Sequence, residues 1–371
     1  MTTEVATGLD TTVITSSLSR VVGIVSRAVP ARSALPIVTN LLLQTDRGRL
    51  KLAATDLDMS IEAWCGAMIH EEGATTVPAR LFTDLLSTFP EAPVHLSLAN
   101  RLQWECARGK GDLPVMSAED YPLLSEVEGD SFEIPAKTLH RALELVTFAA
   151  ATDDSRPVLA GVLVEAKEGR LTFAAADGYR LSVYSMPSEQ TFSVILPRRA
   201  LREVQRICDG STENVRVTID AKRACFEFTD VRLTCQLIQG TFPNYRQLIP
   251  SEFKTTATVE TKPLANAVRR AGVYMASTNL SNPAVRMGFN GSELRVWAET
   301  NDSEGDALLD IEGEGEAMKW ACSPRYLGDL LAVVGEKVTV QLSSPTTQGV
   351  FRNDEDFVHV VMPMFLNGFS Q

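Results

Sequence analysis

Hydrophobic and polar residues alternate along much of this chain with a period of two, which is typical of half-buried strands. Three such runs are Val94/Leu96/Leu98, Val215/Val217/Ile219 and Val338/Val340/Leu342. Between the alternating stretches lie six helix-like windows, at residues 16–29, 79–88, 136–150, 198–208, 262–276 and 324–335. The pattern therefore predicts six helices and many short strands.

The alternating pattern recurs as a unit of about 120 residues. The matching segments are residues 34–56, 157–177 and 282–301. The polar residue that ends each segment moves from Asp56 to Asp177 to Asn301, with offsets of 121 and 124 residues. Prolines close the three units at Pro122, Pro243 and Pro363. Similarity between unrelated strands would not reproduce this spacing.

Each unit contains two helix-like windows among several strands. Such a unit indicates an α+β domain in which two helices pack on antiparallel sheets. A chain of 371 residues is also longer than one hydrophobic core usually supports. We therefore expect three repeated domains, at residues 1–128, 129–252 and 253–371.

The composition is that of a globular protein, with 44% hydrophobic and 22% charged residues. No apolar stretch reaches transmembrane length, and residues 1–19 lack the basic residues of a signal peptide. Six scattered cysteines form no CxxC pair, which favours reduced thiols: Cys65, Cys106, Cys208, Cys225, Cys235 and Cys322. We therefore expect a cytoplasmic protein without a membrane partner.

The net charge of −12 argues against nucleic acid only as a sum, because its distribution is uneven. The six helix-like windows hold four acidic and thirteen basic residues, which gives them +9 and leaves −21 for the remainder. The basic residues are Arg20, Arg27, Arg80, Lys137, Arg141, Arg198, Arg199, Arg202, Arg206, Lys262, Arg269, Arg270 and Arg325. They are either ordinary solvated helix faces or one basic surface that meets phosphates without reading sequence.

Three segments resemble signatures of the bacterial DNA polymerase III β subunit, the β sliding clamp. They are residues 177–181 (DGYRL), 242–250 (FPNYRQLIP) and 360–366 (VVMPMFL). They occur in order within the threefold repeat, and the resemblance covers nearly the whole chain. It implies the DNA clamp (processivity factor) fold and a head-to-tail homodimer. The two chains would close a ring of six domains, with the helices lining a hole that holds duplex DNA.

The resemblance also implies a pocket for short peptides of the polymerase III catalytic subunit, the clamp loader, other polymerases and repair proteins. Its residues would be Leu159, Ala176, Gly178, Tyr179, Arg180, Leu181, Pro243, Gln247, Leu248, Val360, Met362, Pro363, Met364 and Leu366. An apolar groove with a few polar anchors suits this role, and methionines can repack around different peptides. The alternative is that residues 360–366 form only a closing core strand.

For DNA, the resemblance implies contacts from Arg32, Arg199 and Arg325. The chain departs from the family pattern at two kinds of position. In the peptide segments, Gln247 stands where many members have Arg, Phe365 replaces a usual basic residue, and residues 367–371 run past the usual end. Near the implied dimer-interface helix, Ala276 and Ser277 are smaller and less apolar than in some relatives.

No common catalytic constellation is present. The four histidines form no HExxH, and Gly109-Lys110-Gly111 lacks the glycine-rich lead of a phosphate-binding loop. The remaining candidates for Mg²⁺ are the paired carboxylates Asp56/Asp58 and Asp153/Asp154. Because Asp56 recurs in the repeat, a role at a turn or strand end is favoured. We expect no catalytic residue, metal site or cofactor.

Three hypotheses follow from the sequence. The first is a dimeric DNA clamp. The second is a monomeric peptide-binding scaffold of the same fold, which Ala276 and Ser277 motivate. The third is a metal-dependent nuclease or phosphotransferase that uses Asp56 and Asp58. The sequence leaves open which peptides bind, how tightly a ring closes, and whether this is a main or a specialised second clamp.

Overall fold

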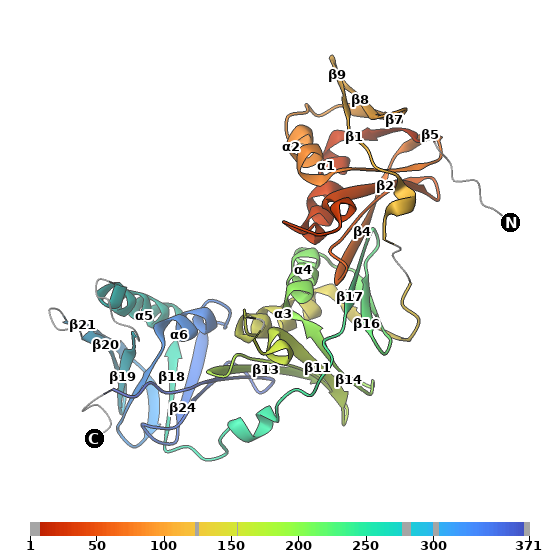
Figure 1. Ribbon diagram of the computed structural model, residues 1–371. Coiled ribbons are helices and arrows are strands. Elements are labelled where there is room, and N and C mark those ends of the chain that lie inside the picture. Colours follow the sequence, from red (N-terminus) through yellow and green to blue (C-terminus); the bar gives the residue numbers. More distant parts are fainter. Residues whose placement is uncertain (1–7, 123–125, 154, 277–282, 300–303, 367–371) are drawn as a thin grey trace. The chain divides into compact units, whose positions relative to one another are not determined.

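The computed structural model describes residues 8–122, 126–153, 155–276, 283–299 and 304–366 (Figure 1). Within these residues the six predicted helices are confirmed, two in each repeat. They are α1 (Thr15–Val25), α2 (Ala79–Leu86), α3 (Ala136–Val146), α4 (Arg198–Cys208), α5 (Thr261–Ala276) and α6 (Pro324–Leu331). In α1, Leu18, Val21, Val22 and Val25 are buried at intervals of one, three and four residues. This spacing gives the helix one apolar face.

The chain divides into two compact units, Met1–Leu139 with Glu203–Leu237, and His140–Arg202 with Ile238–Gln371. The first unit has a five-stranded antiparallel sheet, in the order β5 (Met68–Glu71), β1 (Asp10–Ile14), β7 (Pro93–Leu98), β8 (Leu102–Cys106) and β9 (Gly109–Leu113). Its second, eight-stranded sheet has the order β10 (Asp130–Pro135), β15 (Asn214–Ile219), β16 (Arg223–Glu227), β17 (Val231–Gln236), β4 (Met59–Gly66), β3 (Arg49–Thr55), β2 (Asn40–Asp46) and β6 (Ala74–Pro78).

The second unit has a nine-stranded antiparallel sheet. Its order is β14 (Phe192–Pro197), β11 (Gly161–Lys167), β12 (Arg170–Ala176), β13 (Arg180–Pro187), β26 (Phe357–Val361), β25 (Gly349–Arg352), β24 (Lys337–Leu342), β18 (Thr255–Glu260) and β22 (Glu312–Gly315). A four-stranded sheet follows the order β21 (Glu304–Asp310), β20 (Glu293–Glu299), β19 (Val285–Asn290) and β23 (Met318–Cys322). Helices α5 and α6 pack against each other in this unit (Figure 1). The predicted α+β class is confirmed.

Strands of successive repeats pair within the large sheets. In the first unit, Ile61 of β4 lies opposite Leu233 of β17. In the second, Leu181 of β13 lies opposite Val360 of β26. Backbone hydrogen bonds therefore run across the expected boundaries at residues 128 and 252, and the compact units do not follow these boundaries. The division into three domains stays a prediction.

All six cysteines are buried and unpaired. Burial raises the pKa of the Cys65 and Cys225 thiols to about 11, and the pKa of Cys208 and Cys235 to about 12. These side chains therefore stay protonated at neutral pH. Within the residues that the structure describes, no helix is long and apolar enough to span a membrane.

Candidate functional site

The segment 177–181 forms a tight turn between β12 and β13. The Asp177 Oδ1 atom accepts hydrogen bonds from the backbone N–H groups of Tyr179, at 2.9 Å, and Arg180, at 3.1 Å. Gly178 has φ +93°, and a Cβ atom there would lie 2.6 Å from Nη1 of Arg156. A glycine therefore fits this turn best. The turn leaves the Tyr179 side chain 60% exposed.

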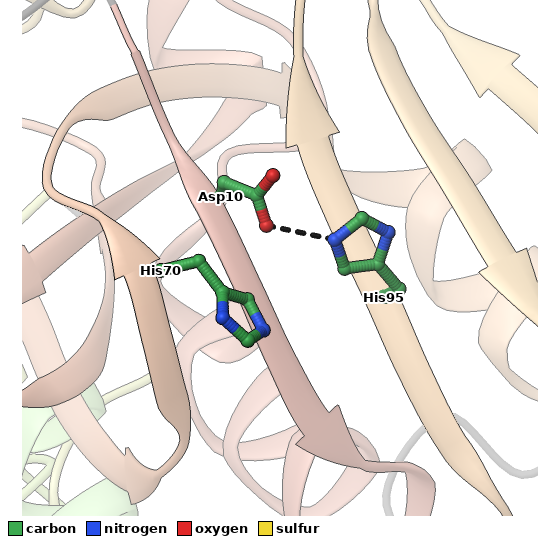
Figure 2. Close-up of side chains that lie close together, drawn as sticks. All are labelled: Asp10, His70 and His95. Carbon is green, nitrogen blue, oxygen red and sulfur yellow. Dashed lines mark hydrogen bonds and ion pairs between the residues drawn. The ribbon is translucent and has the colours of Figure 1, made fainter.

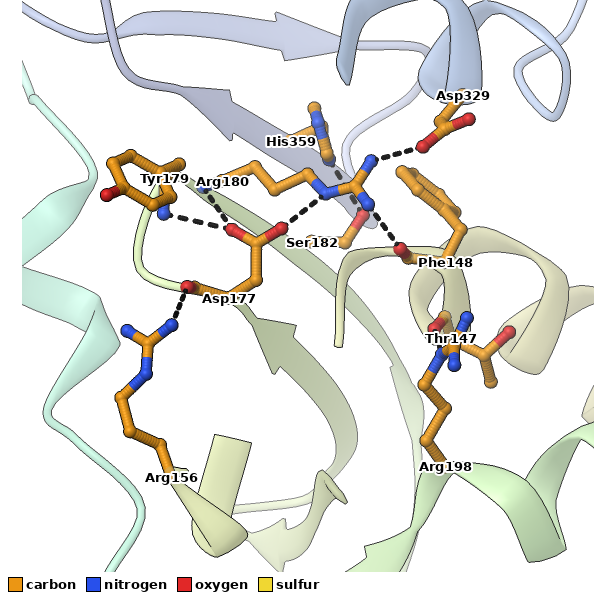
Figure 3. A network of polar contacts seen from close by, with 10 residues as sticks. All are labelled: Thr147, Phe148, Arg156, Asp177, Tyr179, Arg180, Ser182, Arg198, Asp329 and His359. Atoms are coloured by element: carbon orange, nitrogen blue, oxygen red, sulfur yellow. Dashed lines mark hydrogen bonds and ion pairs between the residues drawn. The ribbon is translucent and has the colours of Figure 1, made fainter. Parts of the chain in front are cut away.

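Arg180 points inward from the same turn, and its side chain is only 4% exposed (Figure 3). Its guanidinium donates to Asp177 Oδ2 at 3.0 Å, to Asp329 Oδ2 at 2.6 Å and to the Phe148 carbonyl at 2.8 Å. The Tyr326 ring lies 4.6 Å away. Because its charge is paired inside the protein, Arg180 holds the turn against α6 and the segment that follows α3.

His359, on β26, lies beneath this network and is fully buried. The Ser182 hydroxyl donates to the Leu145 carbonyl at 2.7 Å, so it accepts the bond from Nδ1 of His359, at 2.9 Å. Burial, and secondarily the Arg180 charge, lowers the pKa of His359 to about 3. The ring is therefore neutral, with its proton on Nδ1.

The three signature segments meet at one apolar cluster. Leu159, Ala176, Leu181 and Val360 are all buried in it, together with Tyr245. Strand pairing joins residues 177–181 to β26, and Tyr245 anchors residues 242–250 on the same cluster. Segments more than 60 residues apart along the chain thus form one surface.

Several predicted pocket residues form the exposed part of this surface. Met362 is 43% exposed, Leu248 is 46% exposed, and Pro243 and Gln247 are also exposed. The Met362 N–H donates to the Tyr179 carbonyl at 2.9 Å, which places Met362 beside the turn. Exposed apolar side chains therefore occur in the same segments as the buried residues of the cluster.

Residues 363–366, the last part of the third signature segment, extend away from the turn at residues 177–181 and toward β23. The N–H group of Met364 donates to the Ala321 carbonyl of β23 at 2.8 Å. Pro363, Met364 and Leu366 are half-buried, and Phe365 is 73% exposed. The strand β26 ends at Val361, so residues 360–361 close the core while residues 362–366 lie outside any strand.

The supporting residues of the network were missed by sequence reasoning. These residues come from three segments that only the fold brings to Arg180 and Ser182: Phe148 after α3, Tyr326 and Asp329 on α6, and His359 on β26. One feature could have pointed to Asp329, because it is the only acidic residue in the window 324–335. An acidic side chain is a natural partner for a buried arginine, and the only basic residue of this window is Arg325.

The three predicted DNA-contacting arginines are exposed. Arg32 lies in the loop after α1, Arg199 on α4 and Arg325 on α6. Burial lowers the pKa of Arg198, and the neighbouring charges of Arg202, Arg180 and Arg325 lower it further. Basic side chains from α4 and α6 therefore crowd together within the second unit. Such a concentration of positive charge attracts phosphates.

The paired carboxylates serve as turn residues. The Asp56 Oδ1 atom accepts bonds from the N–H groups of Asp58, at 3.1 Å, and Met59, at 2.8 Å. Asp153 accepts the N–H of Ser155 at 3.2 Å, and the Ser155 hydroxyl lowers the pKa of Asp153. Asp154 lies outside the described residues. Among the described residues, none of these carboxylates belongs to a group of three ligands close enough to share an ion.

Comparison with known families covers almost the entire chain. Models of the DNA polymerase III beta subunit match residues 9–125 with its N-terminal domain, 133–244 with its central domain and 246–365 with its C-terminal domain. The chain belongs to the DNA polymerase III β subunit family. The resemblance of the three signature segments is thereby confirmed.

Relatives of this chain include beta sliding clamps. The beta sliding clamp of Escherichia coli (strain K12) is 32% identical over 353 residues, which cover 92% of this chain and 96% of the relative. That of Synechocystis sp. is 30% identical over 383 residues and covers 95% and 98%. The sliding clamp of Bacillus subtilis has a TM-score of 0.91 at 24% identity, covering 96% and 99%. The expected clamp fold is confirmed, and membership of this processivity-factor family supports a sliding-clamp function in DNA replication.

Proposed function

We propose that this protein closes a head-to-tail homodimeric ring around duplex DNA, and that it tethers partner proteins through short peptides. It would act in the cytoplasm, without a catalytic site or cofactor of its own. The observation that carries the proposal is the meeting of the three signature segments at the Tyr179 turn.

The peptide site combines rigidity with adaptable contacts. The floor, Leu159, Leu181 and Val360, is held by strand pairing and by the core cluster. The exposed rim, Met362 and Leu248, can repack around partner side chains. The aromatic ring of Tyr179 adds a large contact area at small entropic cost. These features fit peptides of the polymerase III catalytic subunit, the clamp loader, and other polymerases and repair proteins.

A relative lends support to a ligand site in this family. The sliding clamp of Pseudomonas aeruginosa, with a TM-score of 0.89 and 26% identity, has been solved bound to griselimycin. The match covers 97% of this chain and 100% of that chain.

The dimer contact is proposed at an exposed apolar patch on α5 and β21. There, Val273 is 67% exposed, Leu308 is 59% exposed and Tyr274 is 38% exposed. The strand β21 is also the edge of its sheet, so it offers unpaired backbone groups. The strand β9 is the edge of the five-stranded sheet in the other unit. Pairing of β21 with β9 of a second copy would be head-to-tail, the geometry that generates rings.

The sequence analysis pointed to two positions near the dimer interface, Ala276 and Ser277. Ser277 is outside the described residues, and Ala276 is the last residue of the helix. The exposed apolar residues Val273 and Tyr274 lie three and two residues before Ala276 on the same helix. They give α5 an exposed apolar surface, although Ala276 and Ser277 are smaller and less apolar than in some relatives.

The proposed DNA contact uses exposed basic residues on helices. These side chains are Arg20, Arg80, Lys137, Arg199, Arg202, Arg206, Lys262, Arg269, Arg270 and Arg325, with Arg32 in a loop. Contacts to phosphates position a protein without reading sequence. Weak individual contacts suit a clamp that is retained by the closed ring and must move along DNA.

The ring proposal is tested by loading the protein onto nicked circular DNA with a bacterial clamp loader and then raising the salt concentration. We expect the protein to stay on the circle and to leave within minutes once a restriction enzyme cuts it. Salt weakens phosphate contacts but cannot open a topological link. Equal loss from circular and linear DNA would contradict the ring.

The peptide site is tested separately with Met362→Asp in the same protein. A charge at this rim should lower affinity for the C-terminal clamp-binding peptide of a polymerase by at least tenfold, because an apolar contact is replaced by a carboxylate that must be desolvated. Leu81→Asp, at a similarly exposed leucine of α2 outside the three signature segments, is the matched control and should bind the peptide as the wild type does. Unchanged peptide affinity in Met362→Asp, measured by fluorescence anisotropy, would place the peptide site elsewhere.

A further inference from the structure

A cluster of two imidazoles and one carboxylate lies on the outer face of the five-stranded sheet. Asp10 is on β1, His70 on the edge strand β5 and His95 on β7 (Figure 2). The opposite face of β1 carries Thr11 and Val13, which are buried. The cluster is therefore open to solvent, and neither the peptide site nor the dimer patch uses these residues.

The geometry of the three side chains is compact. His95 Nε2 and Asp10 Oδ1 are 2.7 Å apart, and the two imidazole rings have centroids 5.9 Å apart. One ligand atom from each residue lies within 4.8 Å of the other two. The Thr12 hydroxyl, on the same face of β1, lies 3.1 Å from Nε2 of His70 and orients that ring.

The backbone contributes to this placement. The register between β1 and β5 shifts between Asp10, which pairs with Glu71, and Thr11, which pairs with Ile69. His70 is therefore the extra residue of a β-bulge. Bulges redirect a side chain relative to the regular alternation of a strand. Here the bulge lies where the imidazole approaches the other two ligands.

We propose that Asp10, His70 and His95 bind a divalent transition-metal ion, Zn²⁺, with water in the fourth position. Two imidazoles and a carboxylate are typical zinc ligands, whereas Mg²⁺ and Ca²⁺ prefer oxygen atoms alone. With bonds of about 2.0 to 2.1 Å, tetrahedral ligands lie roughly 3.3 Å apart. The three ligand atoms lie within 4.8 Å of one another, so binding would require side-chain rotations that bring them to this separation.

The bound ion would connect three adjacent strands. It would fasten the four-residue edge strand β5 to β7 across β1. Edge strands with few contacts open more readily than central ones. The site would therefore stabilise this edge of the sheet, independently of peptide and DNA binding.

The test is calorimetric titration of the full-length, EDTA-treated protein with Zn²⁺ alone. We expect one ion per chain in the wild type, and an affinity at least tenfold lower in both His70→Gln and His95→Gln. Loss of a supporting hydrogen bond to a metal ligand already costs about 10- to 100-fold, and loss of the ligand itself costs no less. His140→Gln, on α3, is the matched control and should bind as the wild type does.

A second readout locates the ion. Zn²⁺ should slow amide hydrogen exchange in residues 68–71 of the wild type and have no such effect in His70→Gln. Co²⁺ in place of Zn²⁺ should give the intense visible absorption of tetrahedral coordination. The proposal fails if the double variant His70→Gln/His95→Gln binds Zn²⁺ as the wild type does, if several weak ions bind with no defined stoichiometry, or if residues 68–71 gain no protection.

Discussion

Near Tyr179, the buried residue Arg180 stabilises the turn, whereas the exposed residues of the turn are available to a peptide. Its charge is balanced by Asp177 and Asp329, and its side chain is almost fully enclosed. Removing one member of such a group would leave an unpaired charge inside the protein, which is strongly destabilising. Arg180 therefore fixes the turn on which Tyr179 is presented, and a bound peptide would reach Tyr179 and Met362 first.

His359 leads to a prediction about pH. Its pKa is about 3 in the folded protein, below the ordinary value of 6.5. As the pH falls below about 6.5, the unfolded chain gains a proton at this residue while the folded protein does not, so acid favours unfolding. In His359→Asn, whose amide can still donate to Ser182, this contribution is absent. We expect the free energy of unfolding of the wild type to fall relative to His359→Asn by about 1.4 kcal/mol per pH unit between about pH 6 and pH 4.

Urea unfolding of both proteins over this pH range gives the measurement. His140→Asn, at a half-buried position on α3, controls for the removal of a histidine as such. Parallel pH profiles for the wild type and His359→Asn would show that residue 359 is protonated in the folded protein or accessible to water.

At the scale of elements, the same turn occurs in the first and second repeats. Asp56 and Asp177 each accept the N–H groups two and three residues ahead. The second residue of the turn has φ +81° at Leu57 and φ +93° at Gly178. A leucine with this backbone conformation is strained, whereas a glycine is not.

Opposite effects on stability are predicted for the two turns. Leu57→Gly should raise the free energy of unfolding by about 1 kcal/mol by removing this strain, and Gly178→Ala should lower it by at least about 1 kcal/mol. Leu35→Gly is the matched control, because Leu35 is also exposed but has φ −103°. It should be neutral or destabilising. Thermal unfolding of the three variants provides the comparison, and a destabilised Leu57→Gly would refute the strain argument.

The elements of the fold were predictable because their signals are local. Helical spacing located all six helices, and the period of two located strands such as β7, β15 and β24. The repeat was also predictable, because its landmarks keep their spacing. The pairing of β4 with β17 and of β13 with β26 could not be predicted. The sequence of a strand does not identify a partner strand more than 150 residues away.

In the candidate site, too, the local features were predictable from the sequence and the long-range contacts were not. The segments that carry it were found from their residues, whereas the inward direction of Arg180 and its partner Asp329 required the fold. The cluster of Asp10, His70 and His95 was missed entirely. Its three residues are separated by 60 and 25 residues along the chain. Their side chains are brought together by a register shift between β1 and β5 that cannot be predicted from the sequence.

At the scale of the whole molecule, the uneven distribution of charge explains how a chain with a negative net charge could bind DNA in the proposed ring. The helix windows carry +9, while the remainder of the chain carries −21. In such a ring, basic helices would attract the phosphates of the enclosed duplex, and acidic strands and loops would disfavour adsorption to other nucleic acid. The net charge of −12 is therefore compatible with a DNA-bound protein whose specificity comes from loading and not from sequence.

The ring requires that two copies associate, and the apolar patch on α5 and β21 allows this to be tested. We expect the wild type to sediment at twice 40.5 kDa at micromolar concentration, and Val273→Asp/Leu308→Asp to sediment at 40.5 kDa. Two carboxylates would have to be desolvated at the contact, which costs more than the apolar surface contributes. Leu81→Asp, at an exposed leucine of α2, is the matched control and should remain dimeric.

The double variant should also leave circular DNA as readily as linear DNA, because a monomer cannot enclose the DNA and so is not topologically linked to it. A monomeric wild type would instead favour the peptide-binding scaffold, and a dimeric double variant would move the interface away from α5 and β21.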